Sequence, residues 1–242
     1  MSPQPAVARQ ETLADAEALA RRVAAWLLDL ALASSGDFSI ALSGGSTPKR
    51  LYEILAEPPY RDGFPWRRTH LFWGDERFVP HDDPRSNFHM ASLALLSRVP
   101  IPPGNVHAVP VQGVGPIAAA SAYEAELRRY HGAEPLSPSR PLFDVTLLGL
   151  GTDGHTASLF PGTAALYERE RWVLAVEGVK AEARITLTYP ALESSSNTAF
   201  LVAGADKRVM LGRLLQRDAA LPAARLTPTG ALTIFADRAA VG

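Results

Sequence analysis

Apolar residues recur along this chain in two alternating patterns, one typical of helices and one typical of buried strands. Apolar side chains spaced three or four residues apart predict helices at 12–33, 48–56, 86–96, 116–131 and 206–218. Short apolar runs predict strands at 38–42, 69–73, 106–109, 143–148, 172–176, 184–188, 199–204 and 231–237. Strands that are separated by helices favour parallel pairing with right-handed crossovers. The strands within 172–188 follow one another more closely, which predicts a mixed sheet there.

We therefore predict an α/β protein with a predominantly parallel, twisted sheet, helices on both of its faces and a smaller mixed-sheet region. The chain has 242 residues, of which 47% are hydrophobic and 20% are charged, so a sizeable core can form. The proline-rich stretches around 58–65, 100–116 and 135–141 are typical of surface loops rather than of linkers between domains. Residues 1–242 are predicted to form a single domain.

Composition and charge exclude several classes of protein. The chain has no cysteine, which excludes disulfides, zinc–thiolate sites, iron–sulfur clusters and a cysteine nucleophile. Its formal net charge of −1 argues against a nucleic-acid partner. No run approaches the roughly 18 apolar residues of a membrane helix, and residues 1–10 lack the apolar core of a signal peptide. We expect a cytoplasmic protein with no nucleic-acid, membrane or obligatory protein partner.

Candidate chemistry begins in ALSGGSTPKRLYEIL (41–55), between a predicted strand and a predicted helix. Its two glycines permit a sharp turn and a close approach of the backbone to a ligand. The hydroxyl residue after them can cap the helix, and Pro48 suits the first helical position. Free N–H groups at a helix start bind anions, although a tight turn with an ordinary cap is the alternative. The residues of the expected phosphate loop are Ser43, Gly44, Gly45, Ser46 and Thr47.

A second polar segment, GDERFVPHDDPRSN (74–87), follows a buried strand. Adjacent ionisable residues at a strand end are costly unless they are solvated or used, so the alternative is an exposed charged loop. Carboxylates here could bind a metal, but no histidine spacing supports such a site and we expect none. The polar residues of this segment are Asp75, Glu76, Arg77, Asp82, Asp83, Arg85 and Asn87.

The stretch GLGTDGHTASLFPG (149–162) places an aspartate and a histidine on a glycine-rich turn after a buried strand. Asp153 and His155 are two residues apart, so in an extended or turn geometry they point the same way. A carboxylate beside an imidazole fixes its tautomer and raises its basicity, which suits a general base. The alternative is an Asp that caps a helix and a surface His.

Two basic residues complete the candidate site. Lys207 falls in the first turn of the helix predicted at 206–218, where the helix dipole disfavours a cation unless an anion is bound nearby. Arg184 opens a predicted strand and can also reach an anion. Each alone could be an ordinary surface charge, but with the glycine loop they predict a phosphate pocket.

Taken together, SGGSTP, GDERFVP followed by SN, GLGTDGHTASLFPG, RITLT and AGADK resemble the 6-phosphogluconolactonase family over about residues 38–212. DGHTASLFPG is the most specific part. The family is similar in fold to glucosamine-6-phosphate deaminases, in which a pattern like IAFNEP follows DGH. The deaminases also tend to carry Asp-Glu-Tyr where this chain has Asp75-Glu76-Arg77, so both differences favour the lactonases.

The resemblance implies an enzyme that hydrolyses 6-phospho-D-glucono-1,5-lactone to 6-phosphogluconate in the oxidative pentose phosphate pathway, without cofactor or metal. It implies His155 as the base and Asp153 as its orienting partner or a contact for substrate hydroxyls. It places Arg77 near the lactone ring or the phosphate, where it could help to stabilise the oxyanion. It implies a substrate and phosphate site made of Ser43, Gly44, Gly45, Ser46, Thr47, Asp75, Arg184 and Lys207. A histidine base predicts activity that is lost below a pH of about 6.5.

Two other functions stay open from the sequence. One is a glucosamine-6-phosphate deaminase/isomerase, which ammonia release would identify. The other is a non-catalytic sugar-phosphate sensor, because related folds serve as effector domains of transcription regulators. Such a sensor normally carries an added DNA-binding segment, whereas the residues before 38 predict one helix rather than a helix-turn-helix pair.

Overall fold

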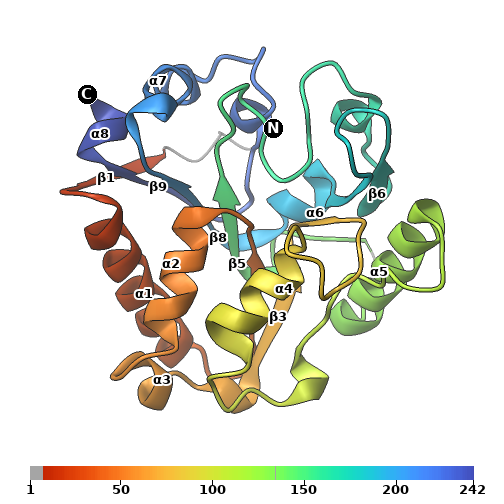
Figure 1. The fold of residues 1–242 in the computed structure, drawn as a ribbon, viewed down its shortest axis with the longest axis horizontal. Helices are drawn as coiled ribbons and strands as arrows, with labels where there is room; N and C mark the ends of the chain where they lie inside the picture. The colour runs from red at the N-terminus through yellow and green to blue at the C-terminus, as the bar shows by residue number, and fades with distance from the viewer. Residues whose placement is uncertain (1–7, 134) are drawn as a thin grey trace.

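The structure, a computed structural model, describes residues 8–133 and 135–242 and is built on two sheets (Figure 1). The larger sheet has six parallel strands in the order β1-β9-β8-β5-β2-β3. These strands are β1 (Arg9–Leu13), β2 (Phe38–Leu42), β3 (Thr69–Trp73), β5 (Phe143–Gly149), β8 (Ser195–Val202) and β9 (Ala231–Asp237). The smaller sheet is antiparallel and contains β4 (Asp75–Arg77), β7 (Arg184–Leu187) and β6 (Val173–Val176), in that order. Of residues 1–10, which carry the expectation of no signal peptide, residues 1–7 lie outside the described residues.

Helices flank the larger sheet, with α1 and α8 on the left of Figure 1 and α5 beside β6 on the right. The α-helices are α1 (Ala16–Ala33), α2 (Ser46–Leu55), α3 (Tyr60–Gly63), α4 (Asn87–Ala91), α5 (Pro116–His131), α6 (Tyr189–Glu193), α7 (Arg208–Leu215) and α8 (Arg238–Val241). The start of α1 follows from its sequence, because the side chain of Asp15 accepts a hydrogen bond from the N–H of Ala18 at 2.8 Å. Among the described residues, no helix is both long enough and apolar enough to cross a membrane.

Strand β2 is the second strand from one edge of the larger sheet and lies between β5 and the edge strand β3. All five of its residues are buried, as expected for a parallel strand that is covered on both faces. The chain winds from β2 towards β3 on one side, whereas β8, β9 and β1 lie on the far side of β5. The sheet therefore has its topological switch point between β2 and β5. In such sheets the crevice for ligands forms at the carboxyl ends of the strands, so the loops after β2 and β5 meet there.

Most of the predicted elements are confirmed. The predicted strands 38–42, 69–73 and 231–237 and the predicted helix 116–131 coincide with β2, β3, β9 and α5. The predicted segment 12–33 begins too early, because α1 starts only at Ala16 and a strand, β1, precedes it. Its pattern misleads because β1 lies at the sheet edge and is mostly exposed.

Three further predictions differ from the structure. The strand predicted at 106–109 is wrong, because only one isolated bridge joins Val106 to Leu71. The strand predicted at 199–204 spans 195–202. Its first four residues are polar, so the apolar pattern did not predict them as part of the strand. The smaller sheet is separate from the larger one and wholly antiparallel rather than mixed. One of its strands is the charged segment Asp75–Arg77, which forms β4 and pairs with β7.

Candidate active site

A cavity of about 280 Å³ opens where the strands of the larger sheet reach their carboxyl ends. Its walls come from the segments that follow β2, β3, β5 and β8, so residues far apart in sequence converge there. The lining residues are Ser43, Gly44, Gly45, Asp75, Arg77, Asn87, Gly149, Leu150, Gly151, Thr152, His155, Ala157 and Lys207.

The loop after β2 can approach the cavity because of its glycines. Gly45 has a φ of +106°, a conformation that favours glycine, and it is the N-cap of α2. A Cβ on Gly44 would lie 2.1 Å from Oδ1 of Asn87, which is far too close. The hydroxyl of Tyr52 fixes the loop, since it donates to the carbonyl of Ser43 at 2.8 Å and accepts from its N–H at 3.0 Å.

The expected side-chain cap of α2 is wrong. Ser46 and Thr47 are the first two residues of the helix, Pro48 is the third, and no side chain caps its N-terminus. The first N–H groups of a helix have no partner within the helix. This helix start therefore keeps the donor capacity that an anion would use.

Strand β4 places opposite charges on the cavity wall. The side chains of Asp75 and Arg77 both line it. Asp75 accepts a hydrogen bond from the hydroxyl of Ser158 at 2.7 Å, and its carbonyl accepts one from the side chain of Asn87 at 2.9 Å. The guanidinium of Arg77 donates to the carbonyl of Arg85 at 2.5 Å. The two ends of the predicted polar segment therefore form part of the cavity wall, whereas Asp82 and Arg85 between them are exposed.

After β5, the turn brings Asp153 and His155 together. Oδ1 of Asp153 contacts Nδ1 of His155 and also accepts the N–H of His155 at 3.1 Å. Burial works against ionisation of Asp153, but the hydrogen bonds from His155 outweigh it and hold the pKa of this carboxyl below its ordinary value. Asp153 is therefore an anion at neutral pH.

The remaining ring nitrogen of His155, Nε2, carries no hydrogen bond to any described residue, and the side chain is 31% exposed at the cavity. The ring packs against Phe160, with 4.8 Å between ring centroids. Gly151 leaves the space that the pair needs, because a Cβ there would lie 2.1 Å from Nδ1 of His155. An oriented imidazole with a free nitrogen in a cavity can act as a general base.

Cations gather on the same side of the molecule. Arg77 and Arg184 face each other in the β4–β7 register, and like charges directly opposite are unfavourable without a counter-ion. Burial, followed by the charge of Arg77, lowers the pKa of Arg184, and its buried Nε has no hydrogen-bond partner among the described residues. Lys207 lines the cavity just before α7, with its Nζ 3.3 Å from the carboxylate of Asp206. These features favour an anionic ligand.

The structure brings seven of the predicted site residues to the cavity wall, namely Ser43, Gly44, Gly45, Asp75, Arg77, His155 and Lys207. The other predicted residues, Ser46, Thr47, Asp153 and Arg184, are not among the lining residues. Asn87 lines the cavity although the sequence assigned it no role. The feature that could have identified it is its place in the polar segment after GDER. No sequence feature identified Thr152 and Ala157 as lining residues, because only the conformation of the turn that carries His155 places them at the cavity.

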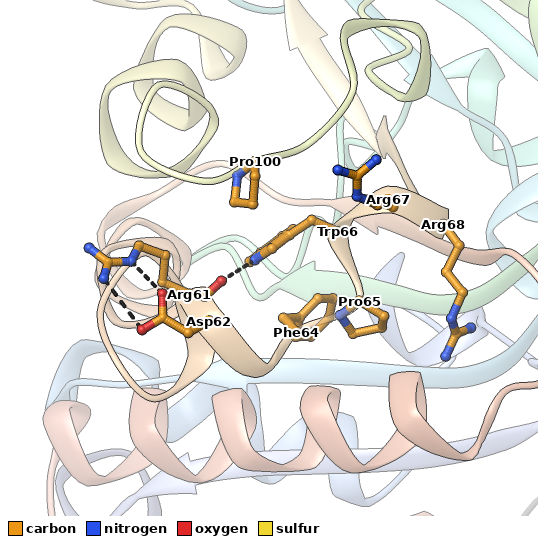
Figure 2. Close-up of a pocket in the computed structure, with 8 residues that line it drawn as sticks. All are labelled: Arg61, Asp62, Phe64, Pro65, Trp66, Arg67, Arg68 and Pro100. Carbon is orange, nitrogen blue, oxygen red and sulfur yellow. Dashed lines mark hydrogen bonds and ion pairs between the residues drawn. The ribbon is translucent and has the colours of Figure 1, made fainter.

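A more voluminous cavity, about 670 Å³, lies beside the segment that leads into β3 (Figure 2). Its walls hold no histidine, and the guanidinium of Arg61 is paired with Asp62 at 2.8 Å. The indole N–H of Trp66 donates to the carbonyl of Arg61 at 2.8 Å. Size alone therefore does not identify the reactive site. No group of three or more His, Asp or Glu side chains in residues 8–133 and 135–242 is arranged to hold a metal ion.

Comparisons with known proteins show the family of this chain. A family model described as "Glucosamine-6-phosphate isomerases/6-phosphogluconolactonase" matches residues 13–235. The chain is 45% identical over 216 residues to a 6-phosphogluconolactonase of Nostoc sp., covering 88% of this chain and 87% of the relative. The crystal structure of a 6-phosphogluconolactonase from Thermotoga maritima is 31% identical with a TM-score of 0.81, covering 96% of this chain and all of that one.

The fold is shared more widely than the sequence. The structure of a monomeric glucosamine-6-phosphate deaminase superposes with a TM-score of 0.80 at 20% identity, covering 96% of this chain and 98% of that one. This likeness concerns the fold alone, and it confirms the expected deaminase-like architecture.

Proposed function

The chain belongs to the family of glucosamine-6-phosphate isomerases and 6-phosphogluconolactonases, and from this premise we propose how its cavity works as that of a 6-phosphogluconolactonase. The reaction is hydrolysis of 6-phospho-D-glucono-1,5-lactone to 6-phosphogluconate in the oxidative pentose phosphate pathway. The observation that carries the proposal is the oriented imidazole of His155 in a cavity that also presents cations.

His155 is the general base of the proposed mechanism. Its free Nε2 removes a proton from a water molecule as that water attacks the lactone carbonyl carbon. The ester bond between that carbon and the ring oxygen then breaks, and the proton passes to the departing ring oxygen. Asp153, held on Nδ1, keeps the imidazole in the correct tautomer and stabilises its protonated form. Arg77 stabilises the negative charge that develops on the carbonyl oxygen.

The phosphate of the substrate binds at the start of α2 and the nearby cations. The loop from Ser43 to Thr47 supplies backbone N–H groups and hydroxyls, and Lys207 and Arg184 supply charge. The phosphate is remote from the ester bond, so its binding energy serves to orient the carbonyl beside His155. Asp75 completes the pocket as an acceptor for substrate hydroxyls.

The proposal also covers the domain organisation, the location and the partners of the protein. We propose one domain for residues 1–242, because buried Ile185 of the smaller sheet belongs to the same hydrophobic cluster as Phe200 of the larger sheet. The substrate is a small sugar-phosphate lactone, and we propose that the enzyme works in the cytoplasm without cofactor, nucleic acid or obligatory protein partner.

The activity is tested by generating the lactone in situ from glucose 6-phosphate and its dehydrogenase and following its decay. A blank without this protein is essential, because the lactone also hydrolyses spontaneously. Decay well above the blank supports the proposal. Decay at the blank rate, together with ammonia release from glucosamine 6-phosphate, would replace it with the deaminase function.

A further inference from the structure

Glu76 is the middle residue of β4 and is 1% exposed, yet it does not line the cavity. Its carboxylate accepts four hydrogen bonds. Oε1 accepts the backbone N–H of Arg77 at 2.6 Å and that of Asn87 at 2.7 Å. Oε2 accepts the N–H of Phe88 at 2.7 Å and the hydroxyl of Ser86 at 3.0 Å. Burial raises the pKa of Glu76, and these four donors oppose that shift.

The two residues that share Oε1 both line the cavity. Arg77 lies in β4 and Asn87 opens α4, so one buried oxygen joins two segments that are ten residues apart. The side chain of Asn87 extends the connection, because it donates to the carbonyl of Asp75 and packs against Gly44. The position of Glu76 thus affects β4, the start of α4 and the glycine loop together.

Three of the four donors lie at the start of α4, so Glu76 also helps to cap this helix, whereas the fourth is the N–H of Arg77 in β4. The N-cap is Ser86, whose hydroxyl already accepts the N–H of His89 at 3.1 Å. A buried carboxylate is costly unless donors surround it, and here each oxygen has two. Two of those four donors belong to the backbone of residues that line the cavity. Such an arrangement fixes a distance across a site as well as a helix end.

We propose that Glu76 is a positioning residue for substrate binding, which sets the separation of Arg77 and Asn87 through a single carboxylate oxygen. Glu76 does not touch the substrate and acts only through its neighbours. This inference rests on the proposed function, since it takes the cavity as the binding site for the substrate and the product.

The test is calorimetric binding of 6-phosphogluconate, the product, to wild type, Glu76→Gln and Glu193→Gln. The amide of the first variant keeps one acceptor oxygen, so its NH2 group opposes two of the four donors. These are either the N–H groups of Arg77 and Asn87 or the donors of Ser86 and Phe88 beside Asn87, so Asn87 is disturbed in both cases. Glu193 is a matched control, because burial raises its pKa and its Oε1 accepts the N–H of Thr227 at 2.9 Å, at the amino end of β8. Thermal midpoints of all three proteins establish that each is folded at the temperature of the titration.

We expect the Kd of Glu76→Gln to rise about 10-fold or more, because small displacements in a preorganised site have large effects. KM should rise with Kd while kcat falls less, and Glu193→Gln should bind like wild type. Equal binding by Glu76→Gln and wild type would overturn the inference. Absence of binding by wild type would instead overturn the proposed function.

A second variant decides the matter if Glu76→Gln does not fold. Ser86→Ala removes one donor to Oε2 and leaves the carboxylate in place. The expected result is a smaller rise in Kd, about two- to fivefold, in a folded protein. An unchanged Kd for Ser86→Ala in that case would overturn the inference.

Discussion

Two histidines of this chain hold a carboxylate on Nδ1, and they differ in what the other ring nitrogen does. Nδ1 of His155 contacts Asp153, and its Nε2 faces a cavity. Nδ1 of His107 lies 2.6 Å from Glu126, but its Nε2 lies 3.0 Å from Nδ1 of His70. The His107 ring also stacks on a phenylalanine and is 7% exposed as a residue. A histidine–carboxylate pair therefore becomes a candidate base only where the second nitrogen meets open space.

The environment of the second pair indicates a structural role. Burial, together with the neighbouring His107, lowers the pKa of His70, which favours the neutral form of that ring. Glu126 is also held by Arg129 at 2.6 Å, which lowers the pKa of that carboxyl. The group fastens α5 to β3. Its chemistry is the same as that of the cavity pair, but His107 is buried and both of its ring nitrogens have partners.

Apart from removal of the imidazole itself, the largest expected effect comes from disturbing the space around one pair only. Gly151→Ala places a Cβ 2.1 Å from Nδ1 of His155 and should separate that ring from Asp153. We expect kcat to fall on the order of 100-fold, as for other small misplacements of catalytic groups. Gly104→Ala is the control, because nothing lies within 4 Å of its added Cβ. Steady-state kinetics of both variants decide, and a Gly151→Ala enzyme with normal kcat would contradict the assigned geometry.

The carboxylates give a second contrast. Asp153→Asn removes the charge that stabilises the protonated imidazole, so kcat should fall about 10- to 100-fold. Glu126→Gln makes the matched change at the buried pair and should leave kcat within about twofold of wild type. The measurement is kcat at neutral pH for both proteins. Equal losses of kcat in the two variants would contradict the assignment of a catalytic role to the cavity pair and a structural role to the buried pair.

Cations beside the two pairs should affect binding differently. Lys207→Ala and Arg184→Ala remove charge from the proposed phosphate site, and we expect KM to rise about 10-fold with a smaller change in kcat. Arg129→Ala removes the exposed cation that pairs with Glu126 and should not change KM. The comparison of KM values is the test. A KM near that of wild type in both cavity variants would place the phosphate elsewhere.

The smallest effect on activity is expected at His107. His107→Gln leaves partners of a buried ring unsatisfied, which should lower the free energy of unfolding by about 1–3 kcal/mol. The value of kcat should stay within about twofold of wild type, because no member of the group lines the cavity. Denaturant unfolding and kinetics on the same preparation test both statements. A large loss of kcat with little loss of stability would assign this pair a functional role.

The sequence predicted β2 and β3 well because nearly all of their residues are buried. FSIAL and THLFW carry the apolar runs of a covered parallel sheet, and both strands lie where expected. Strand β1 was not predicted because it is an exposed edge strand, RQETL, whose residues lack a one-sided apolar pattern. Strand β4 was not predicted because Asp75, Glu76 and Arg77 have low intrinsic strand preference, and only tertiary hydrogen bonds stabilise them there.

The sequence predicted which types of residue form the site, but not the contacts between residues that are distant in the chain. Asp153 and His155 are two residues apart, so their contact follows from local geometry. The role of Asn87 depends on its fit against Gly44, which is 43 positions earlier in the chain, and no sequence pattern records such a contact. The same holds for the four hydrogen bonds of Glu76, three of which come from residues ten to twelve positions away.

The central claim is that a free imidazole nitrogen in the cavity makes His155 the base. The most direct measurement is kcat for lactone decay with His155→Ala and His107→Ala, each corrected for the spontaneous rate. The account predicts a fall of about 10²- to 10⁴-fold for His155→Ala and a nearly normal kcat for folded His107→Ala. Nearly full turnover by His155→Ala would contradict the claim.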